Sequence, residues 1–134
     1  MLKQVSVIAE NKKGSMNKII GGIAAAGVDF YNVVSNDSAE FGLIRMLCSD
    51  PDKALEILQQ EGYLAKVDNV LGVEISETVG SLSKLLSDVS ASRINIDYLY
   101  VCYMRQTDNP VAILRVQEAY EVEECLTGKG YTCL

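Results

Sequence analysis

The sequence predicts an α+β fold made of two copies of one small unit, and three observations lead to this prediction. First, residues 14–20 match residues 80–86 nearly side chain for side chain, an offset of 80 − 14 = 66 residues. Second, alternating apolar residues precede each segment, as in half-buried strands. Third, each segment opens an apolar pattern with the period of an amphipathic helix. We therefore predict two tandem domains, residues 1–67 and 68–134.

The length of each half has a consequence for how the halves behave. The chain has 134 residues, so each copy is about half of that. A domain that short buries a modest fraction of its surface and is marginally stable alone. No stretch rich in Pro, Gly and Ser separates the copies. We therefore expect the two halves to share an interface.

The first strand and helix are predicted in both halves by the same patterns. Residues 4–9 place Val5, Val7 and Ala9 on one face and Gln4 and Ser6 on the other, which is typical of a half-buried strand. The pattern recurs at 71–75, and each strand leads into a turn that ends in glycine. The helices then present an apolar stripe at period 3.6. Its members are Met16, Ile19, Ile20, Ile23 and Ala24, and then Leu82, Leu85, Leu86 and Val89.

The remaining elements follow from β-branched runs and capping residues. Residues 28–34 and 94–104 predict second strands, and residues 41–48 and 111–116 predict third strands. Turns are predicted at 36–38 and 106–110. Asp50 and Pro51 are typical of a helix start, and the second helix has a counterpart before Gly128. Tyr63 and Tyr131 open short fourth strands.

The predicted element order is βαββαβ, written twice. This order is typical of a ferredoxin-like split βαβ sandwich, with both helices on one face of an antiparallel sheet. The opposite face must be solvated or covered by a partner. If the two halves pair side by side, their strands form one eight-stranded sheet.

Charge and hydropathy exclude several classes of function. The net charge is −6 and the sequence pI is about 4.6, so a basic face for nucleic acid is not expected. No run of 18 apolar residues is present, so we expect no association with a membrane. The N-terminus runs directly into a strand pattern without a signal-peptide core. We expect a cytoplasmic protein.

The cysteines and the absence of histidine argue against metal and catalytic chemistry. Cys48, Cys102, Cys125 and Cys133 show no CxxC spacing, so we expect small buried hydrophobes rather than metal or redox groups. The chain has no His, which removes the usual general base and the commonest metal ligand. No phosphate-binding glycine motif is present. We expect no enzyme activity, no catalytic residues, no metal and no cofactor.

These residues resemble the ACT domain family. The match is carried by residues 10–14 leading into the first helix, by residues 26–30, and by Arg93-Ile94-Asn95-Ile96 in the second half. Together they are similar to the family's acidic or amide loop, its Pro-Gly helix start and its Gly-Val/Ile-Asn-Ile strand start. The chain departs from that pattern where Lys13 and Val79 replace the proline and where Arg93 replaces the glycine. The resemblance covers the whole chain, in two copies.

The resemblance implies a regulatory function. ACT domains are small βαββαβ modules that bind amino acids and regulate enzymes, and this chain looks like the free-standing tandem proteins without a fused catalytic domain. We therefore expect a sensor that binds an amino acid and acts through a regulated enzyme or its own homodimer. The alternative is a scaffold that keeps the fold without a ligand and serves protein interaction. Lys13 and Val79 in place of proline favour that alternative.

The resemblance also implies where a ligand binds. In the family the site lies between two domains, and the helix-start loop of one faces the second strand of the other. Helix N-termini offer free N–H groups to a carboxylate, and Ser15 or Ser81 would cap the helix. The expected ligand-binding residues are Asn11, Lys13, Gly14, Ser15, Met16, Asp29, Phe30, Glu77, Gly80, Ser81, Leu82, Asn95 and Ile96.

The imperfect repeat predicts two unequal sites. One site joins Asn11 to Asn95, whose amides both donate and accept, so it holds a carboxylate and an ammonium together. The other joins Glu77 to Asp29, whose carboxylates only accept. A structural interpretation stays open for the same residues: tight turns at the glycines, and local Asx turns at the strand starts.

Overall fold

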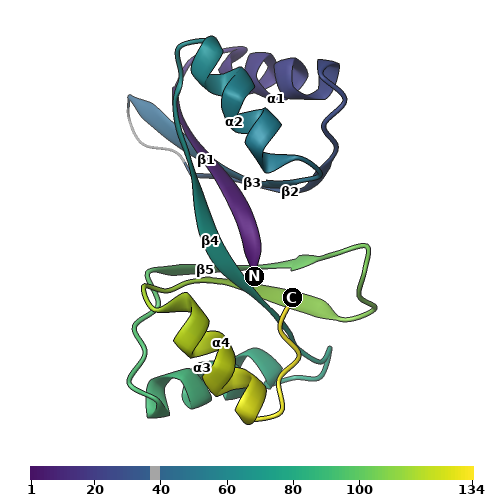
Figure 1. The fold of residues 1–134 in the computed structure, drawn as a ribbon, viewed down its shortest axis with the longest axis vertical. Helices are drawn as coiled ribbons and strands as arrows, with labels where there is room; N and C mark the ends of the chain where they lie inside the picture. The colour runs from purple at the N-terminus through teal and green to yellow at the C-terminus, as the bar shows by residue number, and fades with distance from the viewer. Residues whose placement is uncertain (37–39) are drawn as a thin grey trace. The chain divides into compact units, whose positions relative to one another are not determined.

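The structure is a computed structural model that describes residues 1–36 and 40–134. The predicted turn at 36–38 therefore lies largely outside the described residues. The elements run βαββαβ and then αββα, so the two predicted βαββαβ repeats share one strand (Figure 1). The elements are β1 (Leu2–Glu10), α1 (Ser15–Ala25), β2 (Phe30–Asn36), β3 (Phe41–Cys48), α2 (Pro51–Gln60), β4 (Leu64–Glu74), α3 (Ser81–Ala91), β5 (Tyr98–Tyr103), β6 (Pro110–Arg115) and α4 (Ala119–Gly128).

The chain divides into two compact units. One unit is Lys3–Asp68, and the other joins Met1–Leu2 to Asn69–Leu134. The division falls inside β4, so this strand contributes residues to both units. The limits 1–67 and 68–134 for separate domains stay a prediction.

The Lys3–Asp68 unit has the strand order β2-β3-β1-β4. β1 runs antiparallel to β3, with Val5 opposite Met46 and Val7 opposite Ile44. α1 and α2 cover one face of these strands (Figure 1). α1 buries Ile19 and Ile23 against the inward side chains of β1, which gives this unit its core. α2 begins where the Asp50 carboxylate accepts a hydrogen bond from the Lys53 amide at 3.1 Å, as predicted.

The second unit repeats this arrangement with the strand order β4-β6-β5. The chain end pairs with β4 through a bridge between Val73 and Cys133. α3 and α4 cover one face of these strands and bury Leu85, Val89 and Leu126 against it. Each unit is therefore an α+β sandwich with its own core.

The predicted count of eight strands is wrong, because the described chain has six. The fourth strand of the first repeat and the first strand of the second are one continuous strand, the 11-residue β4. The last predicted strand, after Tyr131, is reduced to the single bridge at Cys133. The arrangement of eight strands in one sheet is therefore not found.

The sequence predicts that β1 is half-buried, and this prediction is wrong for the face of the strand that points away from the helices. Gln4 is 0% exposed and Ser6 is 5% exposed, although both lie opposite the helix-facing valines. The Gln4 amide nitrogen donates to the Ser6 hydroxyl at 3.2 Å, which satisfies part of their polar surface. Val111 and Ile113 on β6 also point away from the helices and are buried. Strand pattern alone did not reveal that this second face is buried.

Two of the four cysteines are buried as predicted. Cys48 and Cys102 are buried, and burial raises the pKa of both thiols. Cys125 and Cys133 are partly exposed, and all four are free thiols. In residues 1–36 and 40–134, no cluster of metal-ligating side chains is present.

No helix in the described part of the chain combines the length and the apolar character that crossing a bilayer requires.

Candidate functional site

The two helix starts that the sequence singles out have the same geometry. Gly14 precedes α1 with φ 86°, and Gly80 precedes α3 with φ 92°, a left-handed conformation that favours glycine. Neither helix has a side-chain cap, so the predicted caps Ser15 and Ser81 are wrong. The Ser81 hydroxyl instead donates to the Ser76 carbonyl at 2.6 Å. The Ser15 and Ser81 amides donate to the Lys12 and Thr78 carbonyls at 3.2 Å, and the next two amides of each helix are left to solvent or to a ligand.

The predicted ligand-binding residues of the loop before α1 line two separate pockets. Asn11, Ser15 and Met16 line a small cavity of about 110 Å3 towards β2 and β3. Lys13 and Gly14, again with Ser15, line a larger groove on the β4 side. The backbone N–H of Asn11 donates a hydrogen bond to the Glu40 carbonyl at 2.9 Å, and this bond fixes the loop.

The second loop differs from the first in its acidic residue. Glu77 accepts a hydrogen bond from the Tyr103 hydroxyl at 3.1 Å, and this bond raises the pKa of Tyr103. Gly80 and Ser81 line a groove of about 500 Å3, whereas Leu82 packs at the margin of the core. Glu77 is therefore held by a side chain of its own unit.

The predicted strand-start residues do not occupy equivalent places. Asp29 directly precedes β2, and its backbone exchanges hydrogen bonds with Ser49 at 2.9 Å, while Phe30 packs on the core. β5 begins only at Tyr98, so the predicted strand start at Ile94 is wrong and Asn95 and Ile96 lie in the preceding loop. The reason is that β6 ends at Arg115 and offers no partner to them.

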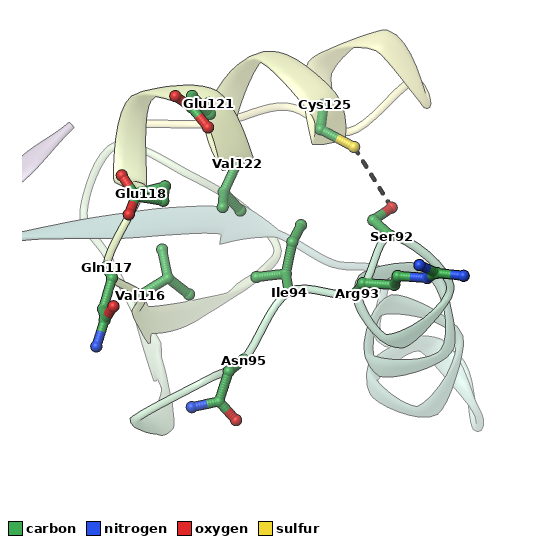
Figure 2. Close-up of a pocket in the computed structure, with 10 residues that line it drawn as sticks. All are labelled: Ser92, Arg93, Ile94, Asn95, Val116, Gln117, Glu118, Glu121, Val122 and Cys125. Atoms are coloured by element: carbon green, nitrogen blue, oxygen red, sulfur yellow. Dashed lines mark hydrogen bonds between the residues drawn. The ribbon is translucent and has the colours of Figure 1, made fainter.

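A pocket of about 510 Å3 lies next to the place where the pairing of β5 with β6 ends, and Asn95 is one of its lining residues (Figure 2). It lies between the end of α3, the start of α4 and the end of β6. Ile94 and Val122 point toward one another, and the Ser92 hydroxyl lies 3.4 Å from the Cys125 sulfur. The Arg93 side chain extends away from Glu118 and Glu121, so the charged groups do not converge (Figure 2). The pocket has no set of groups aimed at one ligand.

Arg93 adopts the backbone conformation of the glycine that it replaces. Its φ is 58°, and Gly27 at the matching position of the first repeat has φ 82°. A left-handed conformation costs an L-residue about 1–2 kcal/mol. The repeat therefore keeps this helix end even where the side chain disfavours it.

The two repeats carry matching grooves between the helix-start loop and the chain after the second helix. The Tyr63 groove, about 740 Å3, is lined by residues 12–15, Lys18, Phe41, residues 61–64, Ile8 and Glu10. The Tyr131 groove is lined by residues 74–76 and 78–81, Lys84, Asn109 and residues 130–132. Lys18 matches Lys84 at offset 66, and Tyr63 matches Tyr131 at offset 68.

Two lining residues of the Tyr131 groove, Lys84 and Tyr131, form a network with the carboxylate of Asp88, which lies outside the lining. Tyr131 donates a hydrogen bond to Asp88 Oδ2, and Lys84 Nζ lies 3.1 Å from the same oxygen. Lys84 Nζ also lies 3.3 Å from the Tyr131 hydroxyl. The bonds from Tyr131 and Lys84 hold the pKa of the Asp88 carboxyl below its usual range. Desolvation and the bond to Asp88 raise the pKa of Tyr131.

Comparison with known proteins decides the family. The family model of the ACT domain pair matches residues 1–131. The chain belongs to the ACT domain family. The search of curated proteins found no significant match. A crystal structure of protein BT0572 from Bacteroides thetaiotaomicron is similar with a TM-score of 0.89 and 27% identity, over 99% of this chain and 91% of that one.

Regulatory subunits share the fold of this ACT domain pair at lower identity. The regulatory subunit of aspartate kinase from Thermus thermophilus, in its ligand-free form, has a TM-score of 0.66 and 16% identity, over 94% of this chain and 89% of that one. The corresponding subunit from Thermus flavus has a TM-score of 0.65 and 15% identity, over 93% and 88%. These likenesses concern the fold.

Sequence reasoning missed part of the chemistry of this ACT domain pair. Lys18, Tyr63, Lys84, Asp88 and Tyr131 were not predicted as site residues. Their signal was present, because both lysines and both tyrosines recur at the repeat offsets. The structure brings Lys13, Gly14 and Ser15 together with Lys18 and Tyr63 in one groove. How the Asn11 loop relates to Asn95 stays a prediction.

The Asp88 network predicts a dependence of stability on pH. A lowered folded-state pKa means that the contribution is present above the unfolded pKa of about 3.9 and is lost as pH falls through the folded value. We expect Asp88→Asn to lower the denaturation midpoint at pH 7 and to flatten its fall below about pH 4. Chemical denaturation across pH measures this. Asp52→Asn, which removes an exposed pair with Lys3, is the control; equal curves for both variants would contradict the prediction.

Proposed function

We propose that this ACT domain pair is a non-catalytic regulatory protein that binds a free amino acid. It acts in the cytoplasm on a regulated enzyme or through its own homodimer. The family match supports a regulatory role, and the fold is shared with the regulatory subunits of aspartate kinase. A ligand would bias one arrangement of the protein over another by its differential affinity for the two.

The observation that carries the proposal is the helix start that both repeats keep. Gly14 and Gly80 adopt the same left-handed turn, and no side chain covers the amides behind them. Free first-turn N–H groups and the helix dipole, about half a positive charge, favour a carboxylate at this place. Every free α-amino acid supplies such a carboxylate.

The two repeats are proposed to differ as ligand sites. The Asn11 loop, in the predicted combination with Asn95, offers groups that both donate and accept. The Glu77 loop, in the predicted combination with Asp29, offers acceptors, and Glu77 is already engaged by Tyr103. We therefore propose that the first repeat supplies the better site.

A thermal-shift screen of the full chain with the twenty amino acids tests the proposed function. A ligand at about 100 times its dissociation constant stabilises the folded state by about 2.7 kcal/mol. We expect a rise of several degrees in the unfolding midpoint with at least one amino acid. Unchanged midpoints with all twenty at millimolar concentration would favour the alternative, a ligand-free interaction scaffold.

A matched pair of glycine variants tests the place of binding. Gly14→Ala and Gly27→Ala each put a side chain at positive φ, at a cost of about 1–2 kcal/mol, and neither new Cβ meets an atom within 4 Å. We expect similar destabilisation by both. Only Gly14→Ala should weaken binding of the amino acid found in the screen, by about tenfold or 1.4 kcal/mol. Equal affinities of the two variants in titration calorimetry would place the ligand elsewhere.

A further inference from the structure

The second repeat contains an internal example of carboxylate binding. Lys84 and Tyr131 line the Tyr131 groove, and both bond one oxygen of Asp88, which lies outside that lining. An ammonium and a hydroxyl that converge on one carboxylate oxygen form strong, charge-assisted hydrogen bonds. The carboxylate comes from one helical turn beyond the lysine, at i+4.

The first repeat keeps the two donors and lacks the carboxylate. Lys18 and Tyr63 line the Tyr63 groove, and Gly22 stands where the second repeat has Asp88, since 88 − 66 = 22. Within residues 1–36 and 40–134, neither the Lys18 ammonium nor the Tyr63 hydroxyl has a hydrogen-bond or ion-pair partner. Gly22 is exposed, and a Cβ there would meet no atom within 4 Å. The first repeat therefore has no carboxylate at the helix position from which Asp88 reaches its lysine and tyrosine.

We infer that the Tyr63 groove binds a free α-amino acid with a large apolar side chain, whose carboxylate is bound by Lys18 and Tyr63 as the Asp88 carboxylate is bound by Lys84 and Tyr131. This inference rests on the proposed function and gives it a ligand class. Both donors line the groove together with Gly14 and Ser15 at the start of α1.

A third lining residue, Glu61, suits the ammonium of the same ligand. Glu61 lines the groove at the C-terminal cap of α2, where the helix dipole favours a cation. Its carboxylate has no hydrogen-bond or ion-pair partner in the described part of the chain. The other acidic lining residue, Glu10, is already 3.0 Å from Lys12. Glu61 is thus the residue that binds the ammonium.

Exposed apolar residues of the groove select the side chain. Ile8 is 41% exposed, Phe41 50% and Leu64 72%, and all three line the Tyr63 groove. The corresponding lining residues of the Tyr131 groove are Glu74, Asn109 and Thr132. Covering apolar surface contributes about 25 cal/mol per Å2. A leucine or phenylalanine side chain therefore gains more here than a small or polar one.

Titration calorimetry of the full chain with L-phenylalanine, L-leucine, glycine, L-aspartate and phenethylamine tests this ligand class. We expect the two apolar amino acids to bind at least tenfold more tightly than glycine and aspartate. Phenethylamine keeps the ring and the amine of phenylalanine but lacks the carboxylate, and it should bind at least tenfold more weakly than phenylalanine. Equal affinities for phenylalanine and phenethylamine would overturn the inference.

Two variants test the site itself with L-phenylalanine as the probe. Gly22→Asp supplies the first repeat with the internal carboxylate, and Lys18→Met removes the ammonium; each should raise the dissociation constant at least tenfold. Ala24→Asp adds the same charge on another side of α1, and Lys84→Met removes the matching lysine of the second repeat. Both controls should bind as wild type. Circular dichroism confirms that each variant is folded.

The outcomes separate this inference from the proposed function. If an amino acid binds and both Gly22→Asp and Lys18→Met retain wild-type affinity for it, the Tyr63 groove is excluded and the proposed function stands. If only small or polar amino acids bind, the ligand class is wrong. If none of the twenty amino acids binds, the inference and the proposed function both fail.

Discussion

Ile23→Ala is expected to destabilise the Lys3–Asp68 unit by about 2–5 kcal/mol. Ile23 is 0% exposed and lies in the core between α1 and the inward face of β1. Its removal forfeits the transfer free energy of three carbon atoms and leaves a cavity that close packing only partly collapses. A unit of this size has a stability of about the same magnitude, so a large fraction of the chains should unfold.

Chemical denaturation measures this effect against an exposed position of the same helix. Met16 is 44% exposed, so Met16→Ala should change the free energy of unfolding by about 0.5 kcal/mol or less. Equal losses for the two variants would contradict the description of α1 as a helix that buries one face.

Gly72→Ala is expected to destabilise the second unit by about 1–3 kcal/mol, the range for overpacked cores. A Cβ at Gly72 would lie 2.9 Å from the Leu2 side chain and 3.3 Å from both Leu134 and Val111. The end of the Leu2 side chain must move, and Leu134 and Val111, which pack on the same position, must give by a few tenths of an ångström. The Gly72 carbonyl also accepts a hydrogen bond from the Leu134 amide at 2.7 Å, which limits how far the strand can shift.

Gly21→Ala is the matched control for this substitution. Gly21 lies inside α1, and a Cβ there meets no atom within 4 Å. Alanine in a helix interior is favoured over glycine by about 0.5–1 kcal/mol, so this variant should be more stable than wild type. The two substitutions are chemically identical and should have opposite signs in the unfolding midpoint. A stabilised Gly72→Ala would contradict the close packing around β4.

The fold was predictable because local patterns and the repeat agree. The apolar stripe from Ile19 to Ile23 and its copy from Leu85 to Val89 place both helices, and Asp50 caps α2 as predicted. The strand count was not predictable from the same patterns. Two short strands with a turn between them were predicted where the structure has the continuous strand β4. The local sequence has no feature that distinguishes these two arrangements.

The start of β5 shows a second limit of local reasoning. Asn95 matches Asp29 in the repeat, yet only Asp29 directly precedes a strand. Strand ends depend on whether a partner strand continues, and β6 ends at Arg115. Residues of the candidate site were missed for a related reason. Lys18 and Tyr63 are far apart in sequence, and only the structure brings them to one groove.

Differences between the repeats carry more functional information than their likeness. Gly22 in place of Asp88 leaves a lysine and a tyrosine without the carboxylate that their counterparts bind. Three apolar lining residues of the first groove, Ile8, Phe41 and Leu64, have polar counterparts in the lining of the second. A tandem pair in which one lysine–tyrosine pair is engaged by an internal carboxylate and the other is not fits a protein with a single main ligand site.

Backbone amide shifts of the full chain, labelled with 15N and titrated with the twenty amino acids, test the central claim most directly. The account predicts saturable shifts of the amides from Gly14 to Lys18 with an amino acid that has a large apolar side chain. Amides of Gly80 to Lys84, in the repeat where Asp88 already binds the lysine and the tyrosine, should move much less. If no amide shifts with any of the twenty at millimolar concentration, the chain is no amino-acid sensor.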